Sequence, residues 1–369
     1  MRRRSSAPSE ESAKQAMASP AGAVRWGVVG ATATIGRLAV LPAIAASPTS
    51  QLVAAATRAA AGLDDPASDP ELAASMAPFD LAATGARISA HYGDVIDDPE
   101  VEAVYIPLPN GLHAEWTFRA AAAGKHVLCE KPLSAYPAEA RAMRDACAQA
   151  GVVLAEAYMT AFHPRARAVV DLAASGGFGA LRFAHAAFTF PLANPDDHRW
   201  DPVLGSGALA DVGVYCLAPL VAAAGRQPVD LAAAARVTSS GVDASISAWL
   251  DFGDGFGGAV ECSFEAPERQ VLELVGTDAW VSVDRAFTPG TADTGFDVHH
   301  RDGRMTRVET GGVDPYRAMI DAFTEVVRAQ ANPERSVAEA VALLELADRL
   351  RIEAGAPLAP LPVGTGRHW

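Results

Sequence analysis

Val101-Glu-Ala-Val-Tyr-Ile-Pro-Leu-Pro-Asn110 decides the fold, because it begins a strand, helix and strand that end at Glu130-Lys131-Pro132. The first stretch is an apolar strand that runs into a proline-stopped loop. A helix is expected over 112–123 and a short strand over 126–129, and this alternation predicts parallel strands. A lysine at the carboxyl end of such a strand lies in the crevice where these sheets bind ligands. Lys131 is therefore a candidate to hold a substrate hydroxyl or carbonyl; in isolation it would be interpreted as a surface residue before a turn.

The chain before and after this stretch has the same alternation of strand and helix. Strands are expected over 24–30, 52–57 and 152–157, and helices over 35–46, about 71–85 and 137–150. The order predicts a doubly wound parallel sheet with right-handed crossovers, a Rossmann domain for a dinucleotide, over residues 24–155.

Beyond residue 155 the pattern changes to strands joined by short turns. A helix is expected over 163–175, and the expected strands are 181–190, 229–238, 244–252, 258–264, 269–276 and 279–283. Helices over 316–329 and 337–355 close the chain, and Ser336 with Glu339 forms a capping box for the second. The pattern predicts an α/β fold overall, with a C-terminal domain over 156–369 that carries a mostly antiparallel, open sheet. An open sheet leaves an apolar face to bury, so this domain is expected to form a homodimer or homotetramer.

Composition excludes several classes of function. The chain has 369 residues and a net charge of −14, without a basic stripe, so no nucleic-acid partner is expected. Its four cysteines lie far apart, which is typical of a reducing cytoplasm and argues against a zinc or disulfide framework. No histidine spacing suggests a metal. Residues 1–23 are expected to be a disordered leader and not an export signal, no membrane span is predicted, and the cytoplasm is the expected compartment.

Gly30-Ala-Thr-Ala-Thr-Ile-Gly36 lies between the first strand and the first helix, where a dinucleotide fold needs close approach to a pyrophosphate. The stretch departs from G-x-G-x-x-G, and an ordinary strand-to-helix turn is the alternative. The cofactor-binding candidates in this turn are Gly30, Thr32, Ala33, Thr34, Ile35 and Gly36.

The second strand ends in Thr57-Arg58, where an acidic residue would bind the ribose hydroxyls of NAD. A hydroxyl and a guanidinium suit a 2′-phosphate instead, so NADP is the expected cofactor and NAD the other option. The alternative is that Arg58 is a solvated loop residue.

Gly205-Ser-Gly-Ala-Leu-Ala-Asp211-Val-Gly-Val-Tyr215 predicts a glycine-rich loop that enters a helix. Asp211 and Tyr215 are four residues apart and share one helical face, so together they suit a polyol. The alternative is a charge near a helix N-terminus beside a core tyrosine.

The chain resembles the glucose–fructose oxidoreductase/inositol dehydrogenase/rhizopine catabolism (Gfo/Idh/MocA) family over about residues 24–355. The motifs are Trp26-Gly27 with the glycine turn, Pro107-Leu-Pro-Asn110 with His113, Glu130-Lys-Pro-Leu-Ser134, Glu156-Ala-Tyr-Met-Thr-Ala-Phe-His163-Pro164, and 205–215. The resemblance implies that the open sheet of the C-terminal domain carries the substrate site, that Asn110, His113 and Glu130 lie near the nicotinamide half of the cofactor, and that Lys131-Pro132 is cis. Pro107 is a further cofactor-binding candidate, and His163 is a candidate to touch the cofactor or the substrate. Lys131, Asp211 and Tyr215 match the catalytic positions of the family. Tyrosine at 215 is most similar to the dihydrodiol dehydrogenase and xylose dehydrogenase branch.

The function expected from this resemblance is hydride transfer between NADP(H) and a hydroxyl or carbonyl of a sugar-like or vicinal-diol small molecule. In oxidation, Tyr215 would take the hydroxyl proton, Lys131 would lower the pKa of the tyrosine, and Asp211 would balance the lysine charge. A non-catalytic NADP-binding sensor and an NAD-dependent glycosidase of the same family are the alternatives. Two departures from the family matter: the glycine turn is one residue longer, which bears on the pyrophosphate contact, and Ala161 replaces a frequent arginine, which bears on a substrate or cofactor contact.

Overall fold

The computed structural model describes residues 22–205, 207–331, 333 and 335–358, so the expected leader lies almost entirely outside the described residues. The first of two sheets, sheet A, is a parallel sheet in the order β3-β2-β1-β4-β5-β6. Its strands are β1 (Val24–Val29), β2 (Ser50–Ala56), β3 (Arg87–Ser89), β4 (Ala103–Ile106), β5 (His126–Glu130) and β6 (Leu154–Ala157). The order reverses between β1 and β4, and ligands of such sheets bind at that point, beyond the carboxyl ends of the strands.

The helices that cover sheet A follow the expected alternation. They are a π-helical turn (Gly36–Val40) that continues into α2 (Leu41–Ala46), α3 (Pro70–Met76), α4 (Tyr92–Asp97), α5 (His113–Ala122) and α6 (Pro137–Ala150). The helix expected over 71–85 is shorter, because α3 ends before the cis peptide bond Ala77–Pro78 and a separate 3₁₀ turn covers Ala82–Thr84. Neither β3 nor α4 was expected.

Sheet B has the order β14-β13-β12-β11-β7-β10-β9-β8 and is antiparallel except for the pair β7 and β10. Its strands are β7 (Leu181–Thr189), β8 (Asp230–Val237), β9 (Asp243–Gly253), β10 (Phe256–Ser263), β11 (Arg269–Gly276), β12 (Ala279–Asp284), β13 (Gly295–His300) and β14 (Met305–Glu309). The predicted fold class, a parallel sheet followed by a mostly antiparallel one, is confirmed; β13 and β14 were not expected.

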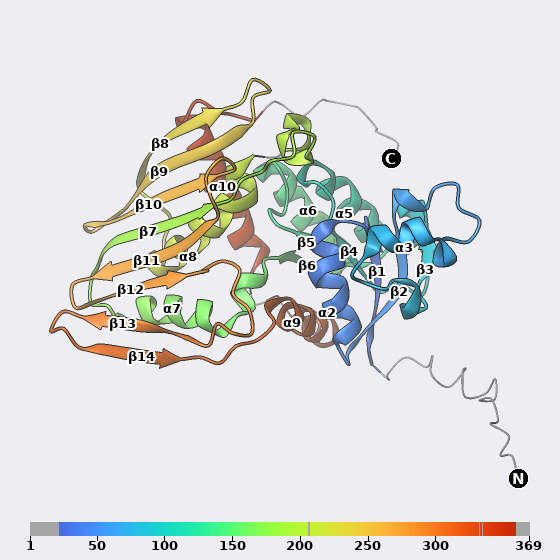
Figure 1. The fold of residues 1–369 in the computed structure, drawn as a ribbon, viewed down its shortest axis with the longest axis horizontal. Helices are drawn as coiled ribbons and strands as arrows, with labels where there is room; N and C mark the ends of the chain where they lie inside the picture. Colours follow the sequence, from blue (N-terminus) through green and yellow to red (C-terminus); the bar gives the residue numbers. More distant parts are fainter. Residues whose placement is uncertain (1–21, 206, 332, 334, 359–369) are drawn as a thin grey trace, which may run out of the picture.

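Figure 1 shows the two sheets side by side, with α9 (Pro315–Ala329) lying next to α2 of the first half. The ring of Phe323 on α9 packs 5.0 Å from that of Trp26 on β1, and Thr324 reaches Ser50 on β2 through a 3.2 Å hydroxyl contact. α9 therefore covers sheet A although it follows sheet B in the chain. The predicted boundary at 155/156 falls inside β6.

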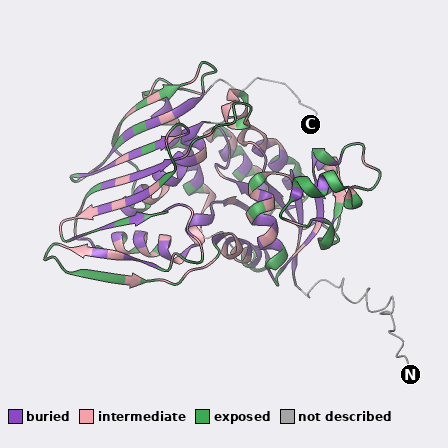
Figure 2. Cartoon of the chain, viewed as in Figure 1, coloured by how far each residue is buried: buried purple, intermediate pink, exposed green. Residues whose placement is uncertain are grey.

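The helices α7 (Pro164–Ala174), α8 (Val214–Ala224) and α10 (Val337–Glu353) complete the second half. The expected capping box of Ser336 and Glu339 begins α10. Along β12 the side chains alternate between buried and exposed, so sheet B has one face in the core and one face outside, as Figure 2 shows.

One described stretch, Pro202–Ala224, is long and apolar enough to cross a membrane by length and composition, although it runs over residue 206. Its most apolar window is 67% buried inside the fold, as in the core helix of a globular domain. The C-terminal part of this stretch is α8, which packs against sheet B.

Candidate active site

A cavity of about 900 Å³ opens at the carboxyl ends of the sheet A strands, between sheet A and the second half of the chain. The glycine turn, the end of β2 and the loop after β4 line one part of it. The other part is lined by Lys131 after β5, by the turn that precedes α8 and by side chains of sheet B. The predicted residues in its wall are Gly30, Thr32, Ala33, Thr34, Ile35, Thr57, Arg58, Pro107, Asn110, Glu130, Lys131, Asp211 and Tyr215. The candidate cofactor-binding residues and the candidate catalytic residues thus line one cavity.

Lys131 and Asp211 form the centre of the second part of the cavity. The lysine Nζ donates to Asp211 Oδ1 at 2.8 Å and to the Asp211 backbone carbonyl at 2.7 Å. Arg199 Nε donates to the other carboxylate oxygen at 2.8 Å, so two cations hold one anion. Burial by itself would raise the pKa of Asp211, but Lys131 and Arg199 outweigh burial and hold this pKa at about 2. Asp211 is therefore ionised at any working pH.

Tyr215 lies beside this ion pair, and the face of its ring, not its hydroxyl, is turned to Lys131. Lys131 Nζ sits 5.1 Å from the centre of the phenol ring, over its face, while the hydroxyl points to Met159 Sδ at 3.6 Å. Burial raises the pKa of Tyr215 well above its usual range, and the neighbouring Tyr316 and Glu130 raise it further. Burial therefore outweighs the effect of Lys131, whose ammonium is engaged by Asp211, and a lowering of the Tyr215 pKa by this lysine stays a prediction. Tyr215 is a protonated phenol here.

The turn that carries Asp211 is a π-helical segment, Leu209–Gly213, and a buried ion pair holds its start. Asp243 accepts a 2.7 Å hydrogen bond from Leu209 N and a 3.3 Å bond from Arg351 Nε of α10. Gly207 has φ of +119°, and a Cβ there would lie 2.2 Å from Asp243 Oδ1. Only glycine fits this approach, so the glycine-rich stretch serves packing around a buried carboxylate.

The cofactor part of the cavity is built at the ends of β1 and β2. Gly30 has φ of +85°, and its backbone N–H, like that of Ala31, donates to Ala56 O. The hydroxyls of Thr32 and Thr57 are 2.9 Å apart, which joins the glycine turn to the end of β2. Arg58 is exposed beside Tyr92, a further residue of the wall, and opposes the rise that burial gives the pKa of that tyrosine. This turn, followed by a helix and flanked by a guanidinium, fits a dinucleotide with a 2′-phosphate.

Glu130 and Asn110 join the two parts of the cavity. Glu130 accepts a 2.7 Å bond from the Tyr105 hydroxyl and a 3.2 Å bond from Lys131 N, and burial raises its pKa. Asn110 Nδ2 donates to Gly205 O at 3.2 Å, which ties the loop after β4 to the loop before Asp211. The peptide bond Lys131–Pro132 is cis, as the resemblance implies.

Three predicted residues lie outside the cavity wall. Gly36 is buried in the π-helical turn. His113 is buried, with Nδ1 3.0 Å from Pro132 O and Nε2 2.7 Å from Leu108 O, so it connects two site loops from behind; burial lowers its pKa to about 4. His163 is also buried: its Nδ1 accepts from Arg165 N at the start of α7, and its Nε2 lies 3.2 Å from Gly290 O. The structure does not bring His163 to the cavity.

Comparison with known proteins identifies the family. A model described as the oxidoreductase family with an NAD-binding Rossmann fold (GFO_IDH_MocA) matches residues 24–158, and one for the GFO/IDH/MocA C-terminal domain matches residues 166–282. The chain belongs to the Gfo/Idh/MocA family. The resemblance drawn from the sequence motifs is confirmed.

Several relatives of this Gfo/Idh/MocA protein are named as dehydrogenases or reductases, two of them for sugar substrates. D-xylose 1-dehydrogenase (NADP(+)) 2 of Haloferax volcanii is 35% identical over 326 residues, which are 88% of this chain and 95% of the relative. The dTDP-3,4-didehydro-2,6-dideoxy-α-D-glucose 3-reductase of Streptomyces violaceoruber is 36% identical over 340 residues, 89% of this chain and 95% of the relative. A 3-ketoreductase from Actinomadura kijaniata, solved with NADP and TDP-benzene, superposes with a TM-score of 0.77 at 29% identity over 90% of this chain and 98% of that one.

Several residues of this Gfo/Idh/MocA cavity were not anticipated from the sequence. They are Tyr92, Met159, Phe188, Phe190, Asp197, His198, Arg199, Glu268, Gln270, Thr288 and Tyr316. Arg199, which binds Asp211, belongs to a short 3₁₀ turn (His198–Trp200) without periodicity. Its one sequence signal is Asp197 two residues earlier, a capping residue type before a turn.

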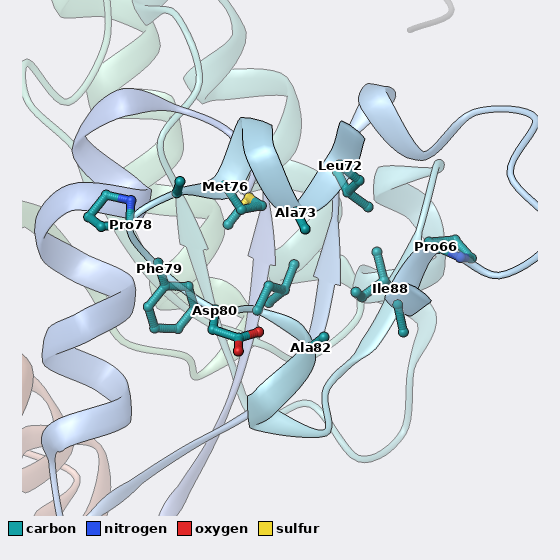
Figure 3. Close-up of a pocket in the computed structure, with 12 residues that line it drawn as sticks. Pro66, Leu72, Ala73, Met76, Pro78, Phe79, Asp80, Ala82 and Ile88 are labelled. Carbon is teal, nitrogen blue, oxygen red and sulfur yellow. The ribbon is translucent and has the colours of Figure 1, made fainter. Parts of the chain in front are cut away.

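Two other pockets lie away from this chemistry. One pocket, of about 240 Å³, is formed by α3, β3 and the segment between them at the edge of sheet A. Its residues, which are apolar except for Asp80, include no predicted site residue (Figure 3). Ala161 lines a separate apolar pocket beside α7 and α8. Among the residues that the structure describes, no group of three or more His, Cys, Asp or Glu is placed to hold a metal ion.

Proposed function

We propose that this protein transfers a hydride between NADP(H) and a hydroxyl, or the matching carbonyl, of a sugar-like or vicinal-diol small molecule. One observation supports this most strongly: Lys131, Asp211 and Tyr215, from two segments of the chain, meet in the same cavity as the glycine turn. The relatives named as NADP-dependent sugar oxidoreductases support the same reaction class.

The cofactor and the protein would have different roles in this reaction. The nicotinamide supplies the hydride chemistry, and the protein supplies alignment and the proton. In reduction, the protonated Tyr215 donates its proton to the substrate oxygen as the carbonyl becomes a hydroxyl. Lys131, fixed by Asp211, places a positive charge beside that oxygen and stabilises the negative charge that develops there. In oxidation the proton moves the other way, from the hydroxyl to Tyr215.

NADP is the expected cofactor because the end of β2 offers Thr57 and Arg58. The Thr57 hydroxyl is fixed by Thr32 at 2.9 Å and by Ala59 N at 3.3 Å, so it has a defined position. Arg58 is exposed at the rim, where it is accessible to a 2′-phosphate.

A homodimer or homotetramer remains the proposed assembly, with the cytoplasm as the proposed compartment. The outer face of sheet B leaves Phe183, Trp249 and Trp280 exposed by 37%, 45% and 41%. Phe183 and Trp249 stack with ring centroids 6.1 Å apart, which forms an apolar patch that a second copy would cover. Sedimentation showing a monomer at micromolar concentration would contradict this assembly.

The reaction is tested by NADP⁺ reduction across a panel of aldoses, polyols and trans-dihydrodiols, together with NADPH oxidation on the matching ketones. Turnover that Lys131→Met abolishes would support the proposal. Tight NADPH binding without turnover of any member would favour the sensor alternative. Cofactor retained through purification, with hydrolysis of glycosides, would favour the glycosidase.

A further inference from the structure

We propose that the substrate is an uncharged sugar or polyol, and that the site rejects sugar phosphates, sugar acids and nucleotide-linked sugars. The inference rests on the proposed function and adds the charge class of the substrate. It is drawn from the charges that line the substrate part of the cavity, where carboxylates outnumber permanent cations.

Each permanent cation of the substrate part already has an anionic partner. Lys131 is bonded to Asp211, and Arg199 is shared between Asp211 and Asp197, with Nη1 3.2 Å from both oxygens of Asp197. These side chains are mostly covered: Lys131 is 14%, Asp211 18% and Asp197 19% exposed. Ion pairs so placed are weakly screened by salt and do not release a cation at low cost.

The remaining ionisable groups of the wall do not reverse this balance. Glu268 is an exposed carboxylate on the loop before β11. His198 lies 3.3 Å from Asp197, and burial lowers its pKa, so it adds little positive charge at neutral pH. Among the wall residues that the structure describes, two permanent cations therefore face three carboxylates, before the buried Glu130 is considered. Arg58 lies at the cofactor end, where the 2′-phosphate would use it.

A phosphate, carboxylate or diphosphate on the substrate would bring negative charge next to this excess of carboxylates. Sites for such groups usually offer unpaired arginine or lysine, and like charges at close range act against binding. Neutral hydroxyls find suitable partners instead: the carboxylates accept from them, and the Tyr215 phenol and the Lys131 ammonium donate. The wall is completed by apolar surfaces of Phe188, Phe190 and Met159, against which a sugar ring packs.

The test compares substrates that differ in charge and keep the reacting carbons alike. The pairs are D-glucose with glucose 6-phosphate, D-galactose with D-galacturonate, and methyl α-D-glucoside with dTDP-glucose, all followed by NADP⁺ reduction. In each pair whose neutral member is turned over, we expect kcat/KM to be at least about tenfold lower for the anionic member. Higher ionic strength should narrow the ratio, because salt screens repulsion.

A variant makes the charge argument specific. Asp197→Asn removes one carboxylate from Arg199, and asparagine still caps the short turn that begins at His198. We expect it to reduce the preference for the neutral member about threefold or more. Asp302→Asn, the same charge change on the β13–β14 turn, should leave the preference unchanged.

Anionic members that react as well as or better than their neutral partners would overturn this inference and leave the proposed function standing. An unchanged preference in Asp197→Asn, with the neutral sugar still turned over, would also overturn it. Bound NADPH with no turnover of any member of these pairs or of the panel of aldoses, polyols and trans-dihydrodiols would overturn the proposed function, and this inference with it.

Discussion

Tyr215→Phe separates the proton-transfer role of this residue from its role in packing. The ring packs against Tyr158, Phe188 and Phe287 at centroid distances of 5.2, 5.7 and 6.4 Å, and phenylalanine keeps these contacts. The hydroxyl contacts Met159 Sδ at 3.6 Å, a weak acceptor, so its loss should change the free energy of unfolding by less than about 1 kcal/mol. We expect kcat to fall by roughly 10²–10⁴, which is about 2.7–5.4 kcal/mol of activation free energy.

The pH dependence of the same residue supplies the second readout. Oxidation requires the deprotonated phenol, and burial raises the pKa of Tyr215 well above its usual range. The rate of oxidation should therefore rise between about pH 7 and about pH 10 without a plateau, whereas reduction, which uses the protonated phenol, should lack this rise. Asp211, with a pKa of about 2, should add no acid limb in this range.

Steady-state kinetics in both directions, with D-xylose as the first substrate tested, measure these effects, and thermal unfolding checks the fold. Tyr158→Phe is the matched control, because the Tyr158 ring packs against that of Tyr215 at a tilt but lines the neighbouring pocket. A Tyr215→Phe enzyme with near-normal rates and an unchanged pH profile would refute the reasoning. Lys131 or a water molecule would then be the acid–base group.

Three further predictions follow from the site and from its support. Lys131→Met should abolish turnover and leave NADPH affinity, measured by fluorescence titration, within about tenfold, because the lysine acts mainly on the transition state. Arg58→Ala should weaken NADP(H) binding by about 1–3 kcal/mol and leave NAD(H) binding almost unchanged; equal losses would contradict the 2′-phosphate assignment. Asp243→Asn removes the buried carboxylate that accepts from Arg351 Nε and from Leu209 N and should cost about 3–5 kcal/mol in urea unfolding, against less than about 1 kcal/mol for the exposed Glu265→Gln.

The sequence predicted the elements that have a strong apolar pattern and missed those that lack one. The buried strands of sheet A and the long closing helices appear where the apolar periodicity indicates them. β3 has three residues, none of them fully buried, and β14 is exposed along most of its length, so neither shows alternation. Both are edge strands that are held by pairing with a neighbour, which periodicity does not record.

Site residues that belong to a sequence motif could be predicted, whereas site residues that reach the cavity only through packing of the loops could not. Lys131 and Asp211 were expected together, and the structure joins them at 2.8 Å. Arg199 was missed because its contact with Asp211 arises from a loop without periodicity. Pro164 is the first residue of α7, and His163 before it is the N-cap, whose side chain accepts from Arg165 N. Proline at the first helical position is the sequence signal for this cap.

The electrostatics of the cavity assign a direction to the resting site. The pKa values of two neighbouring acids are shifted in opposite directions. Asp211 is ionised between two cations, whereas burial keeps Tyr215 protonated although Lys131 is close to its ring. Such a pair is prepared to give a proton to a carbonyl and not to take one from a hydroxyl. Taking a proton requires a further positive charge near the phenol, which would lower its pKa. Without such a charge, deprotonation of Tyr215 depends on raising the pH, which is why the rate of oxidation should climb toward about pH 10.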